Sequence, residues 1–136
     1  MKVEFTVSLV ELKRAFRRLS ARLLDESEVG SEFVIFNARE NDLRIVARRT
    51  SEGLFASLAH SGRARVPFPT FCGIARILRF YRQKTVRFAF SGGVLKIDRT
   101  AIRHPRISVL PGTGRFAARP NVITELGSRK IAVMKT

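Results

Sequence analysis

The hydrophobic positions near the start of the chain change their period at Ser8. Apolar and polar residues alternate over residues 3–7, which is the pattern of a strand with one buried face. Ser8 and Glu11 then have the S-x-x-E spacing of a capping box, which marks the start of a helix. Apolar residues recur after it at steps of three and four, namely Leu9, Leu12, Phe16, Leu19 and Leu23. The pattern predicts a strand over residues 3–7 and a helix over residues 8–24.

Short apolar runs bounded by turn residues fill most of the chain up to residue 107. They predict strands or short extended segments at residues 33–36, 43–47, 54–58, 64–66, 86–90, 94–97 and 101–107. The turns between them are expected at Asn41–Asp42, at Ser51–Gly53 and at Ser91–Gly93. Pro105 indicates that the last strand lies at an edge or contains a bulge.

A second helix is predicted behind Pro67 and Pro69, because Phe71, Ile74 and Leu78 follow at helical spacing. This helix is expected to end near residues 79–81. The predicted order is therefore β-α-βββ(β)-α-βββ, an α+β fold with two helices packed on antiparallel sheets. The length fits one domain over residues 1–110, and residues 111–136, rich in proline and glycine, are expected to form a C-terminal tail that holds at most one added strand.

Net charge changes the picture from a generic small domain to one with an anionic partner. The chain carries 26 Lys and Arg against 11 Asp and Glu, a net charge of +15. The excess lies in residues 53–136, whose acidic side chains are Asp98 and Glu125. Most cations are arginines, whose planar fork suits phosphate oxygens, so nucleic acid is favoured over a membrane surface. Arginine usage set by genome composition is the alternative explanation.

One face of the first predicted helix concentrates this charge. On a helical wheel its cations lie opposite the apolar stripe, and like charges recur at i and i+4, which lowers helix stability unless an anion is bound. The second helix and the residues after it add a smaller set on the side away from its own apolar stripe. The candidate nucleic-acid-binding residues are Lys13, Arg14, Arg17, Arg18, Arg22, Arg76, Arg79, Arg82 and Lys84. Phe80 and Tyr81, beside them, are expected to pack at the helix end rather than to stack on bases.

No catalytic or metal-binding arrangement emerges from the remaining residues. His60 and His104 are isolated, and Cys72 lies next to apolar residues, where an inert thiol is expected. The acidic run of residues 25–32 lacks the glycine and the ligand spacing of a calcium site. We therefore expect no enzymatic activity, no cofactor and no metal. A single cysteine and the absence of a long apolar segment favour a soluble protein of the cytoplasm, associated with the nucleoid.

The order and spacing of four segments resemble one domain of the DNA sliding clamps, the family of the bacterial DNA polymerase III beta subunit. The opening strand and helix correspond to FTVSLVELKRAFRRLS, and the turn and strands that follow to NDLRIVARRTSEGLFASL. The start of the second helix corresponds to RVPFPTFCGIARIL, and the closing hairpin and strand to VRFAFSGGVLKIDRTAIRHPRISV. The resemblance covers about residues 2–110.

The resemblance implies a ring of six such domains that encircles duplex DNA, with helices on the inner wall, and that tethers replication and repair proteins. This chain holds one domain and is strongly basic, whereas members of the family are usually acidic overall. The leading hypothesis is a processivity-clamp-like protein that binds double-stranded DNA through phosphates without reading sequence. A clamp-derived interaction module for replication or repair proteins and an RNA-binding protein remain as alternatives, and a homo-oligomer stays open.

Overall fold

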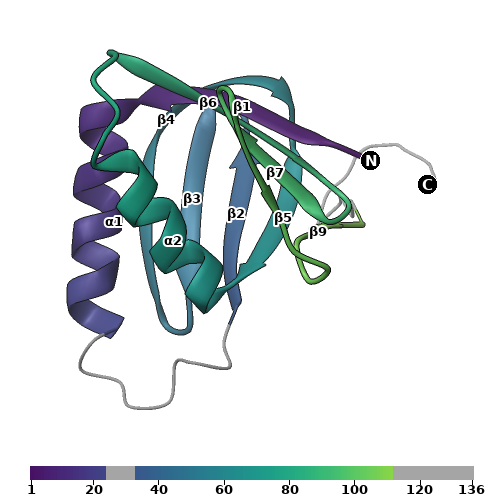
Figure 1. Cartoon of the computed structure of the whole chain (residues 1–136), viewed down its shortest axis with the longest axis horizontal. Helices are drawn as coiled ribbons and strands as arrows, with labels where there is room; N and C mark the ends of the chain where they lie inside the picture. The colour runs from purple at the N-terminus through teal and green to yellow at the C-terminus, as the bar shows by residue number, and fades with distance from the viewer. Residues whose placement is uncertain (24–32, 112–136) are drawn as a thin grey trace.

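The computed structural model describes residues 1–23 and 33–111. Two helices and nine strands make up this part of the chain (Figure 1). The elements are β1 (Val3–Ser8), α1 (Leu9–Leu23), β2 (Phe33–Arg39), β3 (Asp42–Ala47), β4 (Thr50–His60), β5 (Gly62–Pro67), α2 (Phe68–Leu78), β6 (Thr85–Ser91), β7 (Val94–Ile97), β8 (Thr100–Arg103) and β9 (Ser108–Leu110). The predicted α+β class, with two helices on antiparallel strands, is confirmed.

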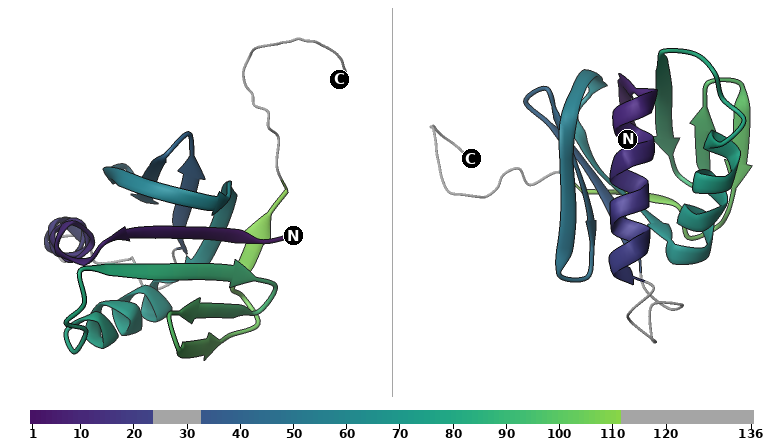
Figure 2. Two further views of the ribbon diagram at one scale, coloured as in Figure 1. Left: turned by 90° about the horizontal axis from the view of Figure 1, so that it is seen from above. Right: turned by 90° about the vertical axis from the view of Figure 1, so that its left-hand side faces the viewer.

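The strands form one antiparallel sheet in the order β8-β7-β6-β1-β4-β3-β2-β5-β9. Strand β4 joins its two halves, because residues 50–55 pair with β3 and residues 56–60 pair with β1. In the right-hand view of Figure 2, strands β2–β4 lie on one side of α1, and strands β6–β8 lie on the other side. The sheet therefore folds over into two facing layers rather than remaining flat.

A cluster of phenylalanine rings fills the space between these layers. Phe36 on β2 lies 5.2 Å from Phe90 and 6.0 Å from Phe88, both on β6, between ring centroids. Phe16 on α1 stacks on Phe71 of α2 with centroids 4.5 Å apart. All five rings are buried. Aromatic burial of this size is a large stabilising contribution, and it fixes how both helices sit against the strands.

The helices lie side by side along one flank of the strands (Figure 1), and each keeps its opposite face in solvent. This placement follows from their apolar stripes. The buried residues of α1 are Leu9, Leu12, Ala15, Phe16 and Leu19, and those of α2 are Phe71, Ile74 and Leu78. Pro67 caps α2 in an extended conformation, as expected for a helix that begins at a proline.

Two turns lie elsewhere than predicted. Ser51–Gly53 are part of β4, and the turn before them is at Arg48–Arg49, with Arg48 at a φ of 54°. The β2–β3 turn is centred on Glu40 and Asn41, both at positive φ, one residue earlier than expected. Short polar side chains suggested a turn at residue 51, whereas residues 51–53 continue the pairing of β4 with β3.

The predicted strand over residues 101–107 is too long. Strand β8 ends at Arg103, because Pro105 cannot donate a ladder hydrogen bond and residues 104–107 form a turn. The edge position expected from Pro105 is confirmed, because β8 lies at one edge of the sheet, and β9, which follows the turn, pairs with β5 at the other edge. The bracketed fourth strand before α2 is present as β5. The boundary of the clamp-like domain at residue 110 stays a prediction, and the tail beyond it lies almost wholly outside the described residues.

Candidate nucleic-acid interface

Helix α1 is held in place at its first turn. The N–H of Glu11 donates to Ser8 Oγ at 3.4 Å, so half of the predicted capping box forms. The N–H of Leu9 donates to the carbonyl of Lys84 at 2.9 Å, which ties the start of α1 to the segment between α2 and β6. The solvent face of α1 is thereby positioned beside the end of α2.

The predicted cations of α1 all lie on its outer side, but they fall into two groups. Arg14 and Arg17 are exposed, and within residues 1–23 and 33–111 they make no hydrogen bond or ion pair. Lys13 is half-buried, and its Nζ donates to the carbonyl of Tyr81 at 3.4 Å. These three cations face solvent without a neutralising carboxylate.

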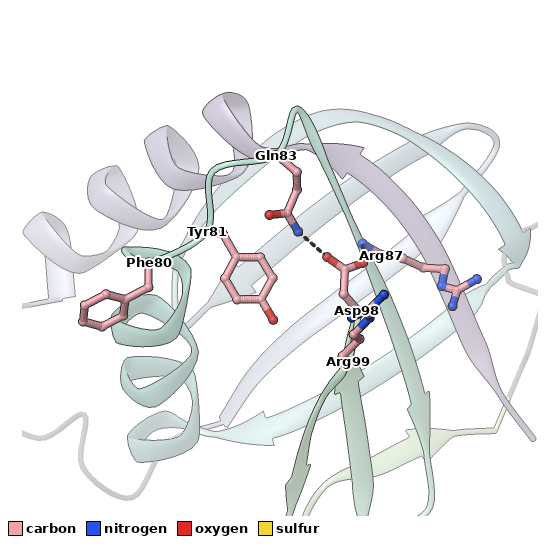
Figure 3. A pocket seen from close by; sticks show the side chains of 6 residues that line it. All are labelled: Phe80, Tyr81, Gln83, Arg87, Asp98 and Arg99. Carbon is pink, nitrogen blue, oxygen red and sulfur yellow. Dashed lines mark hydrogen bonds between the residues drawn. The ribbon is translucent and has the colours of Figure 1, made fainter.

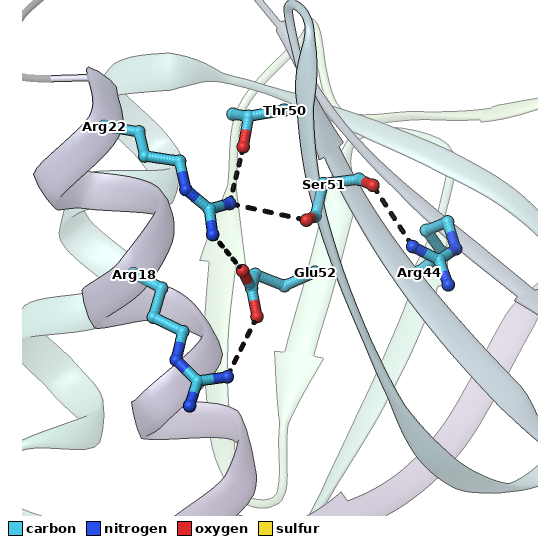
Figure 4. A network of polar contacts seen from close by, with 6 residues as sticks. All are labelled: Arg18, Arg22, Arg44, Thr50, Ser51 and Glu52. Atoms are coloured by element: carbon cyan, nitrogen blue, oxygen red, sulfur yellow. Dashed lines mark hydrogen bonds and ion pairs between the residues drawn. The ribbon is translucent and has the colours of Figure 1, made fainter.

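Arg18 and Arg22, in contrast, are neutralised by Glu52 (Figure 4). Arg18 Nη1 lies 3.3 Å from Glu52 Oε1, and Arg22 Nη2 lies 2.7 Å from Glu52 Oε2. The Glu52 side chain is 12% exposed, while the two arginines are about half exposed. Arg22 Nη1 also donates to Thr50 Oγ1 at 2.6 Å. Two of the five predicted cations of α1 are therefore already neutralised by a carboxylate of the same chain.

Sequence reasoning missed Glu52 because it assigned Ser51–Gly53 to a turn. A signal was present: Glu52 precedes Leu54 and Ala56 at steps of two, and both of these face the core. A carboxylate in phase with two buried apolar residues points toward the inner side of the strand, where α1 passes. Extending the strand backward would have placed it there.

Helix α2 adds two exposed arginines, Arg76 within the helix and Arg79 just after it. A groove of about 310 Å³ runs between the helices, with Lys13, Arg17 and Arg79 around it. Its apolar lining includes Phe16, Ala75 and Leu78. The structure thus brings cations from both helices to one place. We call the half-buried Lys13 and the exposed Arg14, Arg17, Arg76 and Arg79 the helix face.

The remaining candidates, Arg82 and Lys84, lie in the segment between α2 and β6 and are exposed. Arg82 Nη1 donates to the carbonyl of Arg79 at 3.4 Å. Lys84 contributes its backbone carbonyl to the start of α1, as described above. Their side chains sit at the end of the helix pair rather than across it, so they extend the helix face only at one end.

The two aromatic residues after α2 behave differently. Tyr81 packs as predicted, and its hydroxyl donates to the carbonyl of Ile97 at 2.9 Å and lies 3.0 Å from Thr100 Oγ1. Phe80 is 79% exposed, so the expectation that it packs is wrong. The chain turns directly after α2, and this turn directs Tyr81 toward β7 and Phe80 toward solvent (Figure 3).

An open pocket of about 570 Å³ lies between this segment and the β7–β8 turn. Asp98 has a φ of 52°. One of its carboxylate oxygens accepts a hydrogen bond from the N–H of Arg87 at 3.0 Å, and the other accepts one from Gln83 Nε2 (Figure 3). The N–H of Asp98 returns to the carbonyl of Arg87 at 2.9 Å. Asp98 therefore fixes the β7–β8 turn to β6, which is a structural role.

Among residues 1–23 and 33–111, no group of three or more His, Cys, Asp and Glu side chains could hold a metal ion. His104 Nδ1 accepts the N–H of Arg106 at 3.0 Å. Burial raises the pKa of the half-buried Cys72 thiol, and nearby Arg76 offsets this in part. A raised pKa leaves less thiolate at neutral pH, which disfavours nucleophilic chemistry. The acidic run of residues 25–32 lies outside the described residues.

Neither helix in the described part of the chain is long and apolar enough to cross a membrane. The arrangement offers instead a cationic face over two adjacent helices, backed by a packed aromatic core. Such a face can hold phosphates by electrostatic attraction and arginine hydrogen bonds.

Comparison with known proteins places the fold among the sliding clamps. No protein-family model and no curated relative matches the chain. The Caulobacter crescentus beta sliding clamp superposes with a TM-score of 0.61 and 18% sequence identity, over 93% of this chain and 33% of that one. The Helicobacter pylori beta clamp in complex with carprofen has a TM-score of 0.60 and 17% identity, over 90% of this chain and 33% of that one. The Bacillus subtilis DNA polymerase sliding clamp has a TM-score of 0.56 and 7% identity, over 90% of this chain and 34% of that one.

The chain therefore has the fold of a single sliding-clamp domain and spans about a third of the length of these clamps. The expected resemblance to the bacterial DNA polymerase III beta subunit is confirmed at the level of fold.

Proposed function

We propose that this chain is a non-enzymatic, clamp-related protein that binds double-stranded DNA through the phosphates and without sequence preference. The helix face is the binding surface. The observation that carries the proposal is that Arg14 and Arg17 remain without a carboxylate partner on the same helix where Arg18 and Arg22 have one. A like-charge cluster left unpaired costs folding free energy, which a bound polyanion recovers.

Position in the fold supports the same surface. Both helices present their cations to one side, and the groove between them is surrounded by Lys13, Arg17 and Arg79. A duplex presents phosphates continuously along two strands, so contacts spread over adjacent helices are matched without base readout. Replication or repair proteins are further proposed partners, in a cytoplasmic, nucleoid-associated setting, and a homo-oligomer would extend the basic surface.

A clamp-derived protein-interaction module is the second candidate. It is favoured by Phe80, an exposed aromatic ring at the open pocket formed with Gln83, Arg87 and Asp98. Apolar partner binding depends weakly on salt, whereas phosphate binding gives a steep linear fall of log affinity with log salt. Salt dependence therefore separates the two functions.

The test is a salt titration of duplex binding, measured by fluorescence anisotropy on two unrelated 20-bp sequences. The variant Arg14→Gln/Arg17→Gln/Arg76→Gln should make the slope of log affinity against log salt shallower by about 2 to 3 on both sequences. The matched control removes three exposed arginines elsewhere, Arg49→Gln/Arg103→Gln/Arg106→Gln. An equal flattening by the control would mean that overall charge, and not the helix face, holds the DNA.

A further inference from the structure

A second cationic surface lies on the outer side of strands β3, β2 and β5, away from the core. Alternate residues of these strands are buried, so the others project outward. Four outward positions are arginines. Arg39 lies at the end of β2, 4.0 Å from the Glu40 carboxylate, and the other three, Arg44, Arg63 and Arg65, form what we call the outer triad. In the right-hand view of Figure 2, strands β2 and β3 lie on one side of α1. The alternate residues of these strands pack in the core, so the outer triad lies on the face of the strands away from the core.

The strand register brings the outer triad together. Asn37 on β2 faces Arg44 on β3 and Arg63 on β5. Neighbouring strands lie about 4.8 Å apart, so the Cα atoms of Arg44 and Arg63 are separated by roughly 10 Å. Arg63 and Arg65 are two residues apart on one strand, about 6.5 Å. The three guanidinium groups therefore share one small area of the sheet.

Within the described part of the chain none of the three arginines makes an ion pair, although Asp42 occupies the outward position two residues before Arg44 on β3. Arg44 Nη1 donates to Ser51 Oγ at 3.1 Å, and Arg65 Nε donates to Ser108 Oγ at 3.1 Å, so both are oriented by neutral hydroxyls. Arg63 makes no hydrogen bond or ion pair there. The three positive charges lie within roughly a Debye length of one another and therefore repel. An anionic occupant would remove that repulsion.

The surroundings of the triad favour unpaired bases over a duplex. The guanidinium carbon of Arg65 lies 4.5 Å from the centroid of the Phe33 ring, and Phe33, Ile35 and Val46 are all half-buried on the same outer side. Aromatic rings and guanidinium planes stack on bases, and a flat sheet surface with such residues is suited to single strands. A duplex keeps its bases stacked inside and would leave these apolar positions unused.

We propose that the outer triad, together with Phe33 and Ile35, binds a single-stranded nucleic-acid segment. The protein then holds a duplex on the helix face and a single strand on the outer side of strands β3, β2 and β5. This places the protein at junctions between duplex and single-stranded segments. Binding through the helix face alone would not select such junctions.

The first test crosses two charge-matched variants with two ligands, a 20-mer of oligo-dT and a 20-bp duplex hairpin. The outer variant Arg44→Gln/Arg63→Gln/Arg65→Gln should lower oligo-dT affinity about 100-fold at 0.1 M salt, if each residue contacts one phosphate. Its duplex affinity should change by less than about threefold, within the scatter of a distant charge effect. The helix-face variant Arg14→Gln/Arg17→Gln/Arg76→Gln should show the reverse pattern. Circular dichroism checks that both variants fold.

Three results would overturn the proposal. Oligo-dT affinity could be unchanged in the outer variant, both variants could weaken both ligands equally, or polyglutamate of equal charge could displace oligo-dT as well as another oligo-dT does. Loss of duplex binding in the helix-face variant alone would still support the proposed function. The proposed function and the single-strand site can therefore fail separately.

The second test concerns stacking and simultaneous binding. Phe33→Leu removes the ring and no charge, so it should weaken oligo-dA binding about fivefold or more without changing the salt slope. When the protein is bound to a biotinylated duplex on streptavidin beads, the beads should capture labelled oligo-dT. Beads that carry the outer variant should not capture it. Competition between duplex and oligo-dT for a single site would contradict the proposal that the two ligands bind to separate surfaces.

Discussion

Glu52 gives the most direct way to test the helix face, because it restrains two of its neighbouring cations. The substitution Glu52→Gln keeps the shape of the side chain and removes its charge. Arg18 and Arg22 would then lose the ion pairs at 3.3 Å and 2.7 Å. Both arginines are about half exposed, so solvent screening limits the loss, and two pairs of this kind contribute about 1 kcal/mol to the free energy of unfolding.

DNA binding should change in the opposite direction. Releasing two cations on α1 adds one or two phosphate contacts, which steepens the slope of log affinity against log salt by about 1 to 2. At 0.1 M salt the same relation raises duplex affinity about 8- to 60-fold. The variant should therefore be less stable and yet bind DNA more tightly, a combination that a purely structural glutamate does not produce.

Stability is measured by chemical denaturation. Duplex binding is measured by fluorescence anisotropy of a labelled duplex at roughly 0.05–0.3 M salt, the range in which counterion release dominates affinity. Glu40→Gln is the control, because it removes one negative charge from the exposed β2–β3 turn. Unchanged or weaker duplex binding by Glu52→Gln would refute the location of the interface on α1. An equal gain with Glu40→Gln would attribute the effect to net charge.

Three further outcomes are expected. Asp98→Ala should lower the free energy of unfolding by about 0.5–1.5 kcal/mol, seen in urea denaturation, since the exposed backbone N–H of Arg87 loses its hydrogen-bond acceptor. Cys72 should react with iodoacetamide more slowly than free cysteine at pH 7 and approach it only at higher pH, because its raised pKa lowers the thiolate fraction; faster alkylation would contradict this. Light scattering at moderate salt should give a monomer or dimer, since +15 per chain opposes assembly; a stable hexamer without nucleic acid would show that the interface is stronger.

The sequence was sufficient for those elements whose pattern is strictly periodic. The strand at residues 3–8 and the helix at residues 9–23 follow from one change of period and one capping serine, and the hairpin at Gly92–Gly93 follows from its turn residues. Local signals determine these elements, so no tertiary information was required. The solvent side of α1 was predicted for the same reason.

Where the sequence misled, a tertiary contact or a backbone restriction decided the outcome. Glu52 is placed by the passage of α1 over β4, which no local window contains. The break at Pro105 ends β8, and the partner of β9 is β5, some forty residues earlier in the chain. Phe80 is exposed because Tyr81, one residue on, takes the packed position and its hydroxyl finds partners on the β7–β8 hairpin.

The central position of β1 affects how the chain must fold during synthesis. Val3 pairs with Phe90 on one side, and Val7 pairs with Ala56 on the other, so both partners of β1 are synthesised much later than β1 itself. At about 5–20 residues per second, roughly 4 to 17 s separate the synthesis of Val3 from that of Phe90. Throughout that interval β1 exposes at least one unpaired edge and an apolar side. We expect nascent chains stalled before β6 to aggregate or recruit chaperones, and those that include β6 and β7 to become resistant to protease.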